Sequence, residues 1–258
     1  MSDWSPSQYL RFAGHRLRPA LDLLARTPTE KPATVFDLGC GPGNVTRILA
    51  ERWPDAWVTG LDSSAEMLAK AKAEHDFPAN VAFATADLHA WTPAAPADVL
   101  YSNAALQWLV GHEALFPRLM TQVRPGGTLA VQMPRNHAAP SHTSMREAAV
   151  NVGVAAILEP VMRLRPVAEP DFYYDLLAPM AEEVDIWETI YVQILEGDDP
   201  VVEWTKGSAL RPLLAALDDE RRTAYLAEYS RLIATAYSRR PNGRTLLPFR
   251  RLFIVARR

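Results

Sequence analysis

A turn with a glycine at every second position constrains this chain more than any other feature of its sequence. The segment from Val35 to Asn44 has the sequence VFDLGCGPGN, and its glycines are Gly39, Gly41 and Gly43. Glycine lets the backbone turn sharply and approach a ligand that a β-carbon would exclude. Open α/β sheets bind their ligands beyond the carboxyl ends of strands. The segment therefore predicts a buried strand, a ligand-binding turn and a helix in succession.

Strands and helices are expected to alternate through the first half of the chain. Short apolar stretches predict strands at 34–38, 57–62, 81–85, 98–102 and 128–133, with helical spacing in segments such as 5–26 and 112–122. Alternation of this kind is typical of a parallel, doubly wound sheet. Strands that are apolar throughout suit burial on both faces of such a sheet.

The pattern changes after residue 134, where helical spacing replaces the regular alternation of strands and helices. We expect an α/β fold of the Rossmann-like kind, with a mostly parallel sheet of about seven strands in one domain. Within residues 1–258 the predicted parts are an N-terminal helical lid (1–30), a cofactor-binding core (31–134), helical substrate-cap insertions (135–182 and 196–246) and terminal sheet strands (183–195 and 247–258).

Composition and charge exclude several classes of function. The net charge of −3 gives no support for a general nucleic-acid binder, whose surface is usually basic. No apolar run is long enough for a membrane-spanning helix, and the first residues lack a signal-peptide pattern. Cys40 is the only cysteine, so no disulfide can form within the chain. We therefore expect a cytoplasmic monomer with a small-molecule substrate and no nucleic-acid or membrane partner.

Polar residues follow the other parallel strands at the edge where the glycine turn lies. Asp62 ends the second predicted strand, 23 residues after Gly39. An acidic residue about 20 positions after such a turn binds ribose hydroxyls in this architecture. Asp87 follows the third strand and Asn103 the fourth. The G-x-G-x-G spacing departs from the G-x-G-x-x-G dinucleotide fingerprint, which leaves a nicotinamide oxidoreductase as a distant alternative.

This order of motifs resembles the class I S-adenosylmethionine-dependent methyltransferases. The resemblance implies that Asp37 fixes the turn or reaches the methionine amino group, Asp62 holds the ribose and Asp87 bonds the adenine amine. Met67 is expected to pack on the adenine. The predicted cofactor-binding residues are Asp37, Leu38, Gly39, Cys40, Gly41, Asp62, Ser63, Met67, Ala86, Asp87, Leu88, Ser102, Asn103, Ala104 and Trp108. Cys40 reads as a close-packed small residue, since no activating base is evident near it.

A larger set of motifs restricts the resemblance to one family within this class. It comprises W-x-P-x-x-Y from Trp4 to Tyr9, NAALQW at 103–108, VQMP at 131–134, VDIWET at 184–189, LRP at 210–212 and RLFIVARR at 251–258. In this order they resemble the trans-aconitate methyltransferases, a family within the class, over essentially the whole length. The resemblance implies methyl transfer from S-adenosylmethionine to a carboxylate of trans-aconitate, giving a monomethyl ester and S-adenosylhomocysteine.

The chemistry of such an acceptor agrees with the residues of the chain. A carboxylic acid has a pKa of about 4 and is already an ionised nucleophile at neutral pH, so we assign no general base and no metal. The carboxylates that do not react need cationic partners, and arginine supplies 23 of the 27 cationic side chains. The candidate substrate-binding residues are Arg211, Tyr9, Tyr174, Tyr173, Trp4, Arg16 and Arg146.

Three other functions remain open at this stage. One is a class I methyltransferase that acts on another small molecule, such as a different acid, a phenol or an amine. Another is a cofactor-binding module without catalytic activity, and the last is the nicotinamide oxidoreductase. The inserted helices decide the substrate, and their sequence constrains the acceptor less than the turn constrains the cofactor.

Overall fold

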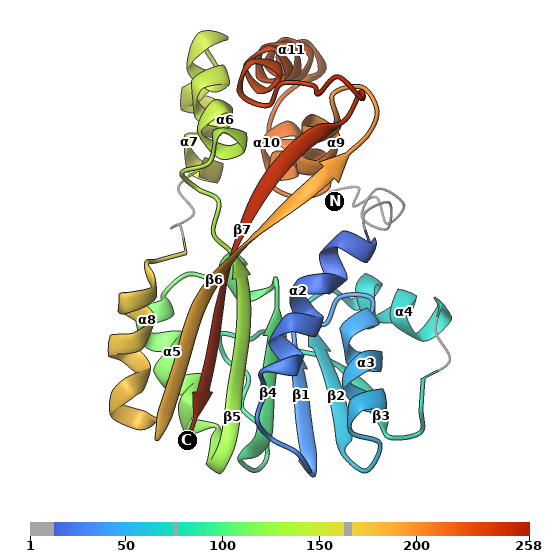
Figure 1. The fold of residues 1–258 in the computed structure, drawn as a ribbon, viewed down its shortest axis with the longest axis vertical. Helices are drawn as coiled ribbons and strands as arrows, with labels where there is room; N and C mark the ends of the chain where they lie inside the picture. Colours follow the sequence, from blue (N-terminus) through green and yellow to red (C-terminus); the bar gives the residue numbers. More distant parts are fainter. Residues whose placement is uncertain (1–12, 75–76, 163–166) are drawn as a thin grey trace. The chain divides into compact units, whose positions relative to one another are not determined.

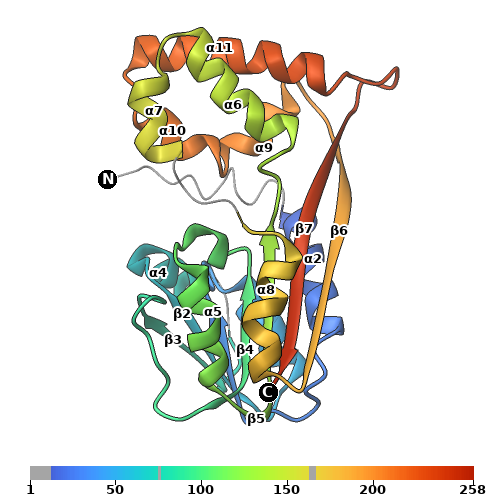
Figure 2. The same ribbon diagram turned by 90° about the vertical axis from the view of Figure 1, so that its left-hand side faces the viewer.

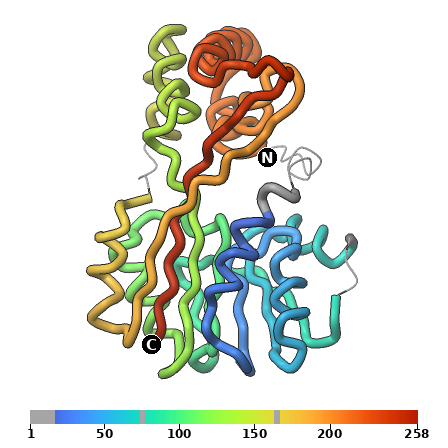
Figure 3. The backbone as a smooth tube through the Cα atoms, in the orientation of Figure 1, coloured from blue at the N-terminus to red at the C-terminus, as the bar shows by residue number. Residues whose placement is uncertain are grey.

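The structure is a computed structural model that describes residues 13–74, 77–162 and 167–258. It has two compact units: a sheet unit (17–74, 77–134, 167–189 and 251–258) and a helical unit (13–16, 135–162 and 190–250). The chain leaves the sheet unit after Pro134 and again after Thr189, and it is back in that unit at Val167 and at Arg251 (Figure 3). The strands are β1 (Thr34–Leu38), β2 (Trp57–Asp62), β3 (Val81–Thr85), β4 (Ala97–Asn103), β5 (Val123–Pro134), β6 (Glu183–Leu195) and β7 (Thr245–Arg257).

Helices account for much of the remaining described chain (Figure 1). Those with residues in the sheet unit are α2 (Ala13–Ala25), α3 (Asn44–Arg52), α4 (Ala65–Glu74), α5 (His112–Thr121) and α8 (Pro170–Leu177), with short 3-10 turns η1 (Leu106–Trp108) and η2 (Ala178–Met180). Those of the helical unit are α6 (Pro140–Asn151), α7 (Ala155–Met162), α9 (Pro200–Lys206), α10 (Leu210–Ala215) and α11 (Asp219–Ala236).

The strands form one seven-stranded sheet in the order β3-β2-β1-β4-β5-β7-β6. Strands β3, β2, β1, β4 and β5 pair in parallel, and β7 is antiparallel to β5. The prediction of a doubly wound, mostly parallel seven-stranded sheet is confirmed. The order reverses beside β1, so the carboxyl ends of β1 and β4 meet at the switch point where such sheets bind ligands.

Strand β5 begins earlier than predicted, because the Arg124–Gly127 turn interrupts the strand and does not precede it. Ala97 is paired with Val123 and Val99 with Thr128, so the turn loops out between two consecutive pairs. Gly126 has a φ of 77°, and a β-carbon on Gly127 would lie 2.7 Å from the carbonyl oxygen of Asp98. The residues of the turn predict the loop. The pairing of Val123 with Ala97 depends on β4, so the sequence around Val123 does not predict it.

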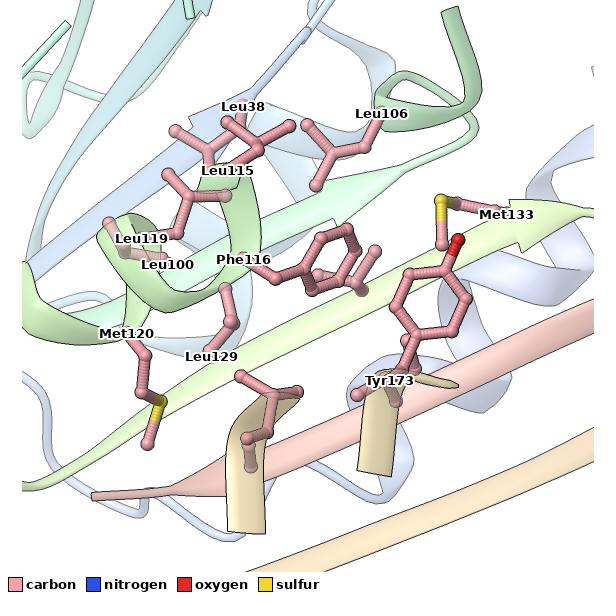
Figure 4. Packing of buried hydrophobic residues seen from close by; sticks show 14 of the residues in the cluster. Leu38, Leu100, Leu106, Leu115, Phe116, Leu119, Met120, Leu129, Met133 and Tyr173 are labelled. Atoms are coloured by element: carbon pink, nitrogen blue, oxygen red, sulfur yellow. The ribbon is translucent and has the colours of Figure 1, made fainter. Parts of the chain in front are cut away.

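One face of the sheet is covered by α5 and α8, which lie side by side in both ribbon views (Figures 1 and 2). Their apolar side chains pack on alternate residues of the strands. Phe116 of α5 and Tyr173 of α8 pack against the side of the sheet that carries Leu100 and Met133 (Figure 4). This cluster is the core of the sheet unit and holds the central strands in place.

The opposite face carries α2 and α3. Tyr101 follows Leu100 in β4 and therefore points to the other side, where its hydroxyl donates a hydrogen bond to the carbonyl of Ala20 in α2. Thr46 of α3 donates to Asp37 of β1 on this same face. The α3 connection from β1 to β2 lies on this face because parallel crossovers are right-handed.

The helical unit has its own core, formed by α6, α7, α9, α10 and α11 with parts of β6 and β7. Two buried tyrosines of α11 fix the neighbouring helix: Tyr225 donates to the carbonyl of Met145 and Tyr229 to that of Ser141. The predicted helices between 200 and 238 are present. Helix α8, expected in the first insertion, belongs to the sheet unit because its buried face packs on α5.

No helix among the described residues is long and apolar enough to cross a membrane. Within the same residues, no three or more His, Cys, Asp or Glu side chains gather in a way that could hold a metal ion.

Candidate active site

The glycine turn after β1 is built as its sequence predicts. Gly39, Gly41 and Gly43 have φ values of 76°, 54° and 82°, a region that side chains disfavour. The backbone N–H groups of Gly39 and Cys40 both donate to the carbonyl of Leu61 at the end of β2. A β-carbon on Gly39 would lie 2.2 Å from the β-carbon of Ala105, so the turn is seated directly on the segment that follows β4.

Gly41 leaves open space at the centre of the turn. A β-carbon there would meet no atom within 4 Å, in contrast to Gly39 and Gly43. Its N–H donates to Oδ2 of Asp62 at 2.8 Å, and Oδ1 of Asp62 accepts the N–H of Ser64 at 2.9 Å. Asp62 therefore fixes both the turn and the start of α4, where the hydroxyl of Ser64 accepts the N–H of Met67.

Asp37 lies beneath the turn and is buried. Its Oδ2 accepts a 2.7 Å hydrogen bond from Thr46, while burial and the nearby charge of Asp62 raise its pKa to about 7. The hydrogen bond from Thr46 opposes this rise. Asp37 is therefore a carboxyl whose ionisation responds to any cation that enters the site.

The end of β3 contributes a second acidic position. Asp87 is exposed, and its Oδ1 accepts the N–H of His89. The N–H of Ala86 donates to the carbonyl of Asp62, which fixes the ends of β2 and β3 together. Leu88 is buried and Met67 half-buried, while Ser63 is exposed beside Asp62. These residues place two carboxylates at the edge of the sheet where a nucleoside is expected.

The segment at the end of β4 and just after it has a strained backbone and buried polar atoms that form no hydrogen bond with the described residues. Ala104 has a φ of 56°, which a residue with a β-carbon rarely adopts. Ser102 is fixed by a hydrogen bond from its hydroxyl to the carbonyl of Leu38. In the part of the chain that the structure describes, the buried Oδ1 of Asn103 and Oε1 of Gln107 accept no hydrogen bond. Strain and unsatisfied buried acceptors of this kind are typical of ligand sites.

Cys40 is buried against the turn, and its Sγ lies 3.0 Å from the point that a β-carbon on Gly60 would occupy. Burial, followed by the charges of Asp37 and Asp62, raises the pKa of its thiol. A thiol that stays protonated is a poor nucleophile, and close packing accounts for the residue.

The predicted substrate-binding residues lie in different parts of the chain. Arg211 is half-buried on α10 and Arg146 is exposed on α6, where it donates to the carbonyl of Met162. Tyr174 is 53% exposed on α8, whereas the neighbouring Tyr173 is buried with its hydroxyl bonded to His112. Arg16 lies on α2. Trp4 and Tyr9 lie outside the described residues. Their roles in binding stay predictions.

Sequence reasoning missed three polar residues that the fold brings to this edge. Thr46 holds Asp37, Gln132 is fully buried at the end of β5, and Arg251 is buried at the start of the paired part of β7. Gln132 and Arg251 stand within the motifs VQMP and RLFIVARR. For Gln132 the available signal was a polar residue inside an apolar strand, because such residues are rarely buried without a partner.

The residues present fit S-adenosylmethionine. The turn has open space over Gly41 for a ligand, Asp62 and Asp87 lie at the ends of β2 and β3, and Asn103 and Gln107 offer acceptors to a cationic amino group. Trp108, the last residue of η1, is 48% exposed. The remaining part of the predicted cofactor set, Leu38, is buried at the end of β1 beneath the turn.

Comparison with known proteins gives concordant results. The sequence model of a family described as "Methyltransferase domain" matches residues 35–127. The chain is 50% identical over 256 residues to the trans-aconitate 2-methyltransferase of Azoarcus sp. strain BH72, covering 99% of each chain. It is 48% identical to the protein of that name from Klebsiella pneumoniae strain 342, covering all of this chain and 99% of the other.

Solved structures support the fold. The YcgJ protein of Bacillus subtilis is 14% identical with a TM-score of 0.58, covering 93% of this chain and 99% of that one. Phosphoethanolamine N-methyltransferase 2 of Haemonchus contortus, solved with S-adenosyl-L-methionine, is 17% identical with a TM-score of 0.54, covering 93% of this chain and 52% of the other.

Proposed function

The chain belongs to the trans-aconitate 2-methyltransferase family, and we propose that it transfers the methyl group of S-adenosylmethionine to a carboxylate of trans-aconitate. The products are the monomethyl ester and S-adenosylhomocysteine. The observation that carries the proposal is the identity of 46–50% to curated relatives of that name over nearly the full length. The class I fold and the glycine turn agree with it.

The reaction asks for positioning more than for proton transfer. Bound S-adenosylmethionine supplies an electrophilic methyl group, and the acid is ionised at neutral pH because its pKa is about 4. The chain therefore needs no general base. Its residues have to align the two reactants, and alignment contributes about 7–11 kcal/mol to barrier reduction in favourable cases.

Each cofactor-binding residue has a proposed task that its place in the structure supports. Asp62 holds the glycine turn through Gly41 and accepts the ribose hydroxyls with its remaining lone pairs. Asp87, exposed at the end of β3, accepts the adenine amine. The buried Asp37, whose pKa burial raises to about 7, is proposed to attract the cationic methionine portion.

The binding of the acid is the less constrained part of the proposal. The residues proposed to bind it are those predicted from the sequence: Arg211, Tyr174, Tyr173, Arg16, Arg146, and Trp4 and Tyr9 outside the described ranges. We further propose that the enzyme acts as a cytoplasmic monomer on a free polycarboxylate, without nucleic acid or membrane.

The test is an assay of the purified enzyme with S-adenosylmethionine and a panel of di- and tricarboxylic acids, with the esters identified by mass spectrometry. The proposal predicts that trans-aconitate is esterified with the highest kcat/KM. Faster methylation of another acid, a phenol or an amine would keep the methyltransferase assignment and reject this acceptor.

A further inference from the structure

Buried polar side chains at the ligand-binding edge of the sheet separate into acceptors and donors. Among described residues, Oδ1 of Asn103, Oε1 of Gln107 and Nε2 of Gln132 are buried with no hydrogen-bond partner. Because the large majority of buried side-chain polar atoms in folded proteins are paired, three such atoms in one region indicate a ligand. The acceptors follow β4, and the donor stands on β5.

Arg251 adds a cation to the donor side. It is only 4% exposed, and its Nη1 donates to Oε1 of Gln132 at 3.3 Å. Arg251 is the register partner of Pro134 at the end of β5, so its antiparallel strand places it at the carboxyl edge of the parallel strands. This bond orients the amide of Gln132, whose Nε2 group is left as a donor beside a guanidinium.

A short series of contacts joins this pair to the glycine turn. The turn is seated on Ala105 through Gly39, and the N–H of the preceding Ala104 donates to the backbone carbonyl of Gln132 at 2.9 Å. Asn103 is the register partner of Gln132. Gln132 and Arg251 therefore border the same site as the cofactor turn, and all of these residues belong to the sheet unit.

The chemistry of this arrangement matches the two charged reactants. A guanidinium and an adjacent amide N–H form a planar set of donors suited to a carboxylate. Acceptors on the neighbouring strand suit a cationic amino group. The donors thus select for an anion, and the acceptors for the methyl donor.

We propose that Arg251 and Gln132 bind a carboxylate of the acid substrate that is not methylated. This inference rests on the proposed function and makes Arg251 a substrate-binding residue that decides preference for polycarboxylates. Gln132 is a positioning residue, since its amide oxygen fixes the guanidinium and its amide N–H adds a donor. Arg251 acts in addition to Arg211, Arg146 and Tyr174.

Two conservative variants test this role in the full-length enzyme. Arg251→Lys keeps the charge but loses the planar fork, and Gln132→Glu keeps the size while giving Arg251 a permanent anionic partner. The Kd for trans-aconitate is measured by calorimetry in the presence of S-adenosylhomocysteine, beside KM for both substrates, Kd for S-adenosylhomocysteine and Tm. Arg257→Gln is the matched control, because Arg257 lies on the same strand but is exposed and paired with Glu182.

The proposal predicts a 10- to 100-fold rise, on the order expected for charge-assisted hydrogen bonds, in Kd and KM for trans-aconitate in both variants. The affinity for S-adenosylhomocysteine and the Tm should stay near those of the wild type, as should every value of Arg257→Gln. Wild-type affinity for trans-aconitate in both variants would overturn the inference, and so would equal losses for both ligands.

The same measurements separate this inference from the proposed function. If wild-type enzyme binds trans-aconitate but forms no ester, the proposed function fails, while the binding data still decide the role of Arg251. If the wild type methylates trans-aconitate and Arg251→Lys and Gln132→Glu leave its KM unchanged, the function stands and the inference is rejected. A wild type that does not bind trans-aconitate overturns both.

Discussion

The carboxylate of Asp62 accepts the backbone N–H of Gly41 at 2.8 Å, which joins the end of β2 to the glycine turn after β1. The same side chain is the proposed acceptor of the ribose hydroxyls. Asp62 therefore shapes the turn and is also proposed to contact the ligand, so its removal should weaken cofactor binding in two ways.

Asp62→Ala is expected to weaken the binding of S-adenosylhomocysteine by about 10- to 100-fold, because each hydrogen bond to a charged group contributes roughly 1.5–3 kcal/mol. Calorimetry gives the Kd. Glu51→Ala is the control, since Glu51 is exposed on α3 and forms a surface ion pair with Arg47. An unchanged Kd for Asp62→Ala would show that the ribose assignment is wrong.

Gly39→Ala should destabilise the fold more than Gly111→Ala. Both glycines have a positive φ, 76° and 73°, but only at Gly39 would a β-carbon collide with a neighbour, Ala105. The shared conformational cost is about 1 kcal/mol, and the collision adds at least as much again. Urea unfolding of the two variants measures the difference, and equal stabilities would contradict the close seating of the turn.

Cofactor binding should depend on pH through Asp37, whose pKa of about 7 is raised mainly by burial. Bringing a cationic amino group near it lowers that pKa, so binding is coupled to loss of a proton below about pH 7. The affinity for S-adenosylhomocysteine should rise by about tenfold from pH 6 to pH 8, and binding at pH 6 should release a proton. Asp37→Asn should remove this dependence.

Asp37 affects the stability of the ligand-free fold in the opposite direction: its contribution becomes less favourable as the pH rises. Because the pKa of Asp37 is higher in the folded chain than in the unfolded one, its favourable contribution is complete below about pH 4 and is lost as the pH rises through 7. Asp37→Asn should therefore stabilise the ligand-free protein more at pH 8 than at pH 5. Thermal unfolding at the two values checks this, and a pH-independent difference would show that Asp37 does not titrate in this range.

Tyr173→Phe should destabilise the sheet unit by about 1–3 kcal/mol, since Nδ1 of the half-buried His112 and the N–H of Ala168 would both lose their partner. Tyr174→Phe is the matched control, because its side chain is about half exposed and should change stability by less than about 0.5 kcal/mol. Chemical denaturation compares the two variants. Equal effects would mean that the contact of Tyr173 with His112 contributes little.

The parts of the fold that depend on local sequence could be predicted. The strands 34–38, 57–62, 81–85 and 183–195 have their observed bounds because each is an apolar or alternating stretch closed by turn residues. The early start of β7 at Thr245 and the pairing of Val123 depend on neighbouring strands. The local sequence does not tell which strands those are. The assignment of α8 to the sheet unit likewise depends on its packing against α5, a contact between distant parts of the sequence.

The same distinction holds for the candidate site. The turn and Asp62 stand close to each other in sequence and follow a spacing, so they could be predicted. Gln132 and Arg251 are 119 positions apart and form their contact only through the pairing of β5 with β7. In the sequence Gln132 is a lone polar residue in an apolar run, and Arg251 is the second of two adjacent arginines before one. Neither pattern distinguishes a ligand-binding group from a residue at a strand edge.

The most direct test of the central claim is the initial rate of ester formation from trans-aconitate and S-adenosylmethionine by the wild-type enzyme, compared with other di- and tricarboxylic acids. The account predicts one monomethyl ester of trans-aconitate, formed together with an equal amount of S-adenosylhomocysteine and with the highest kcat/KM of the panel. Cofactor binding without any methylated acid would contradict it.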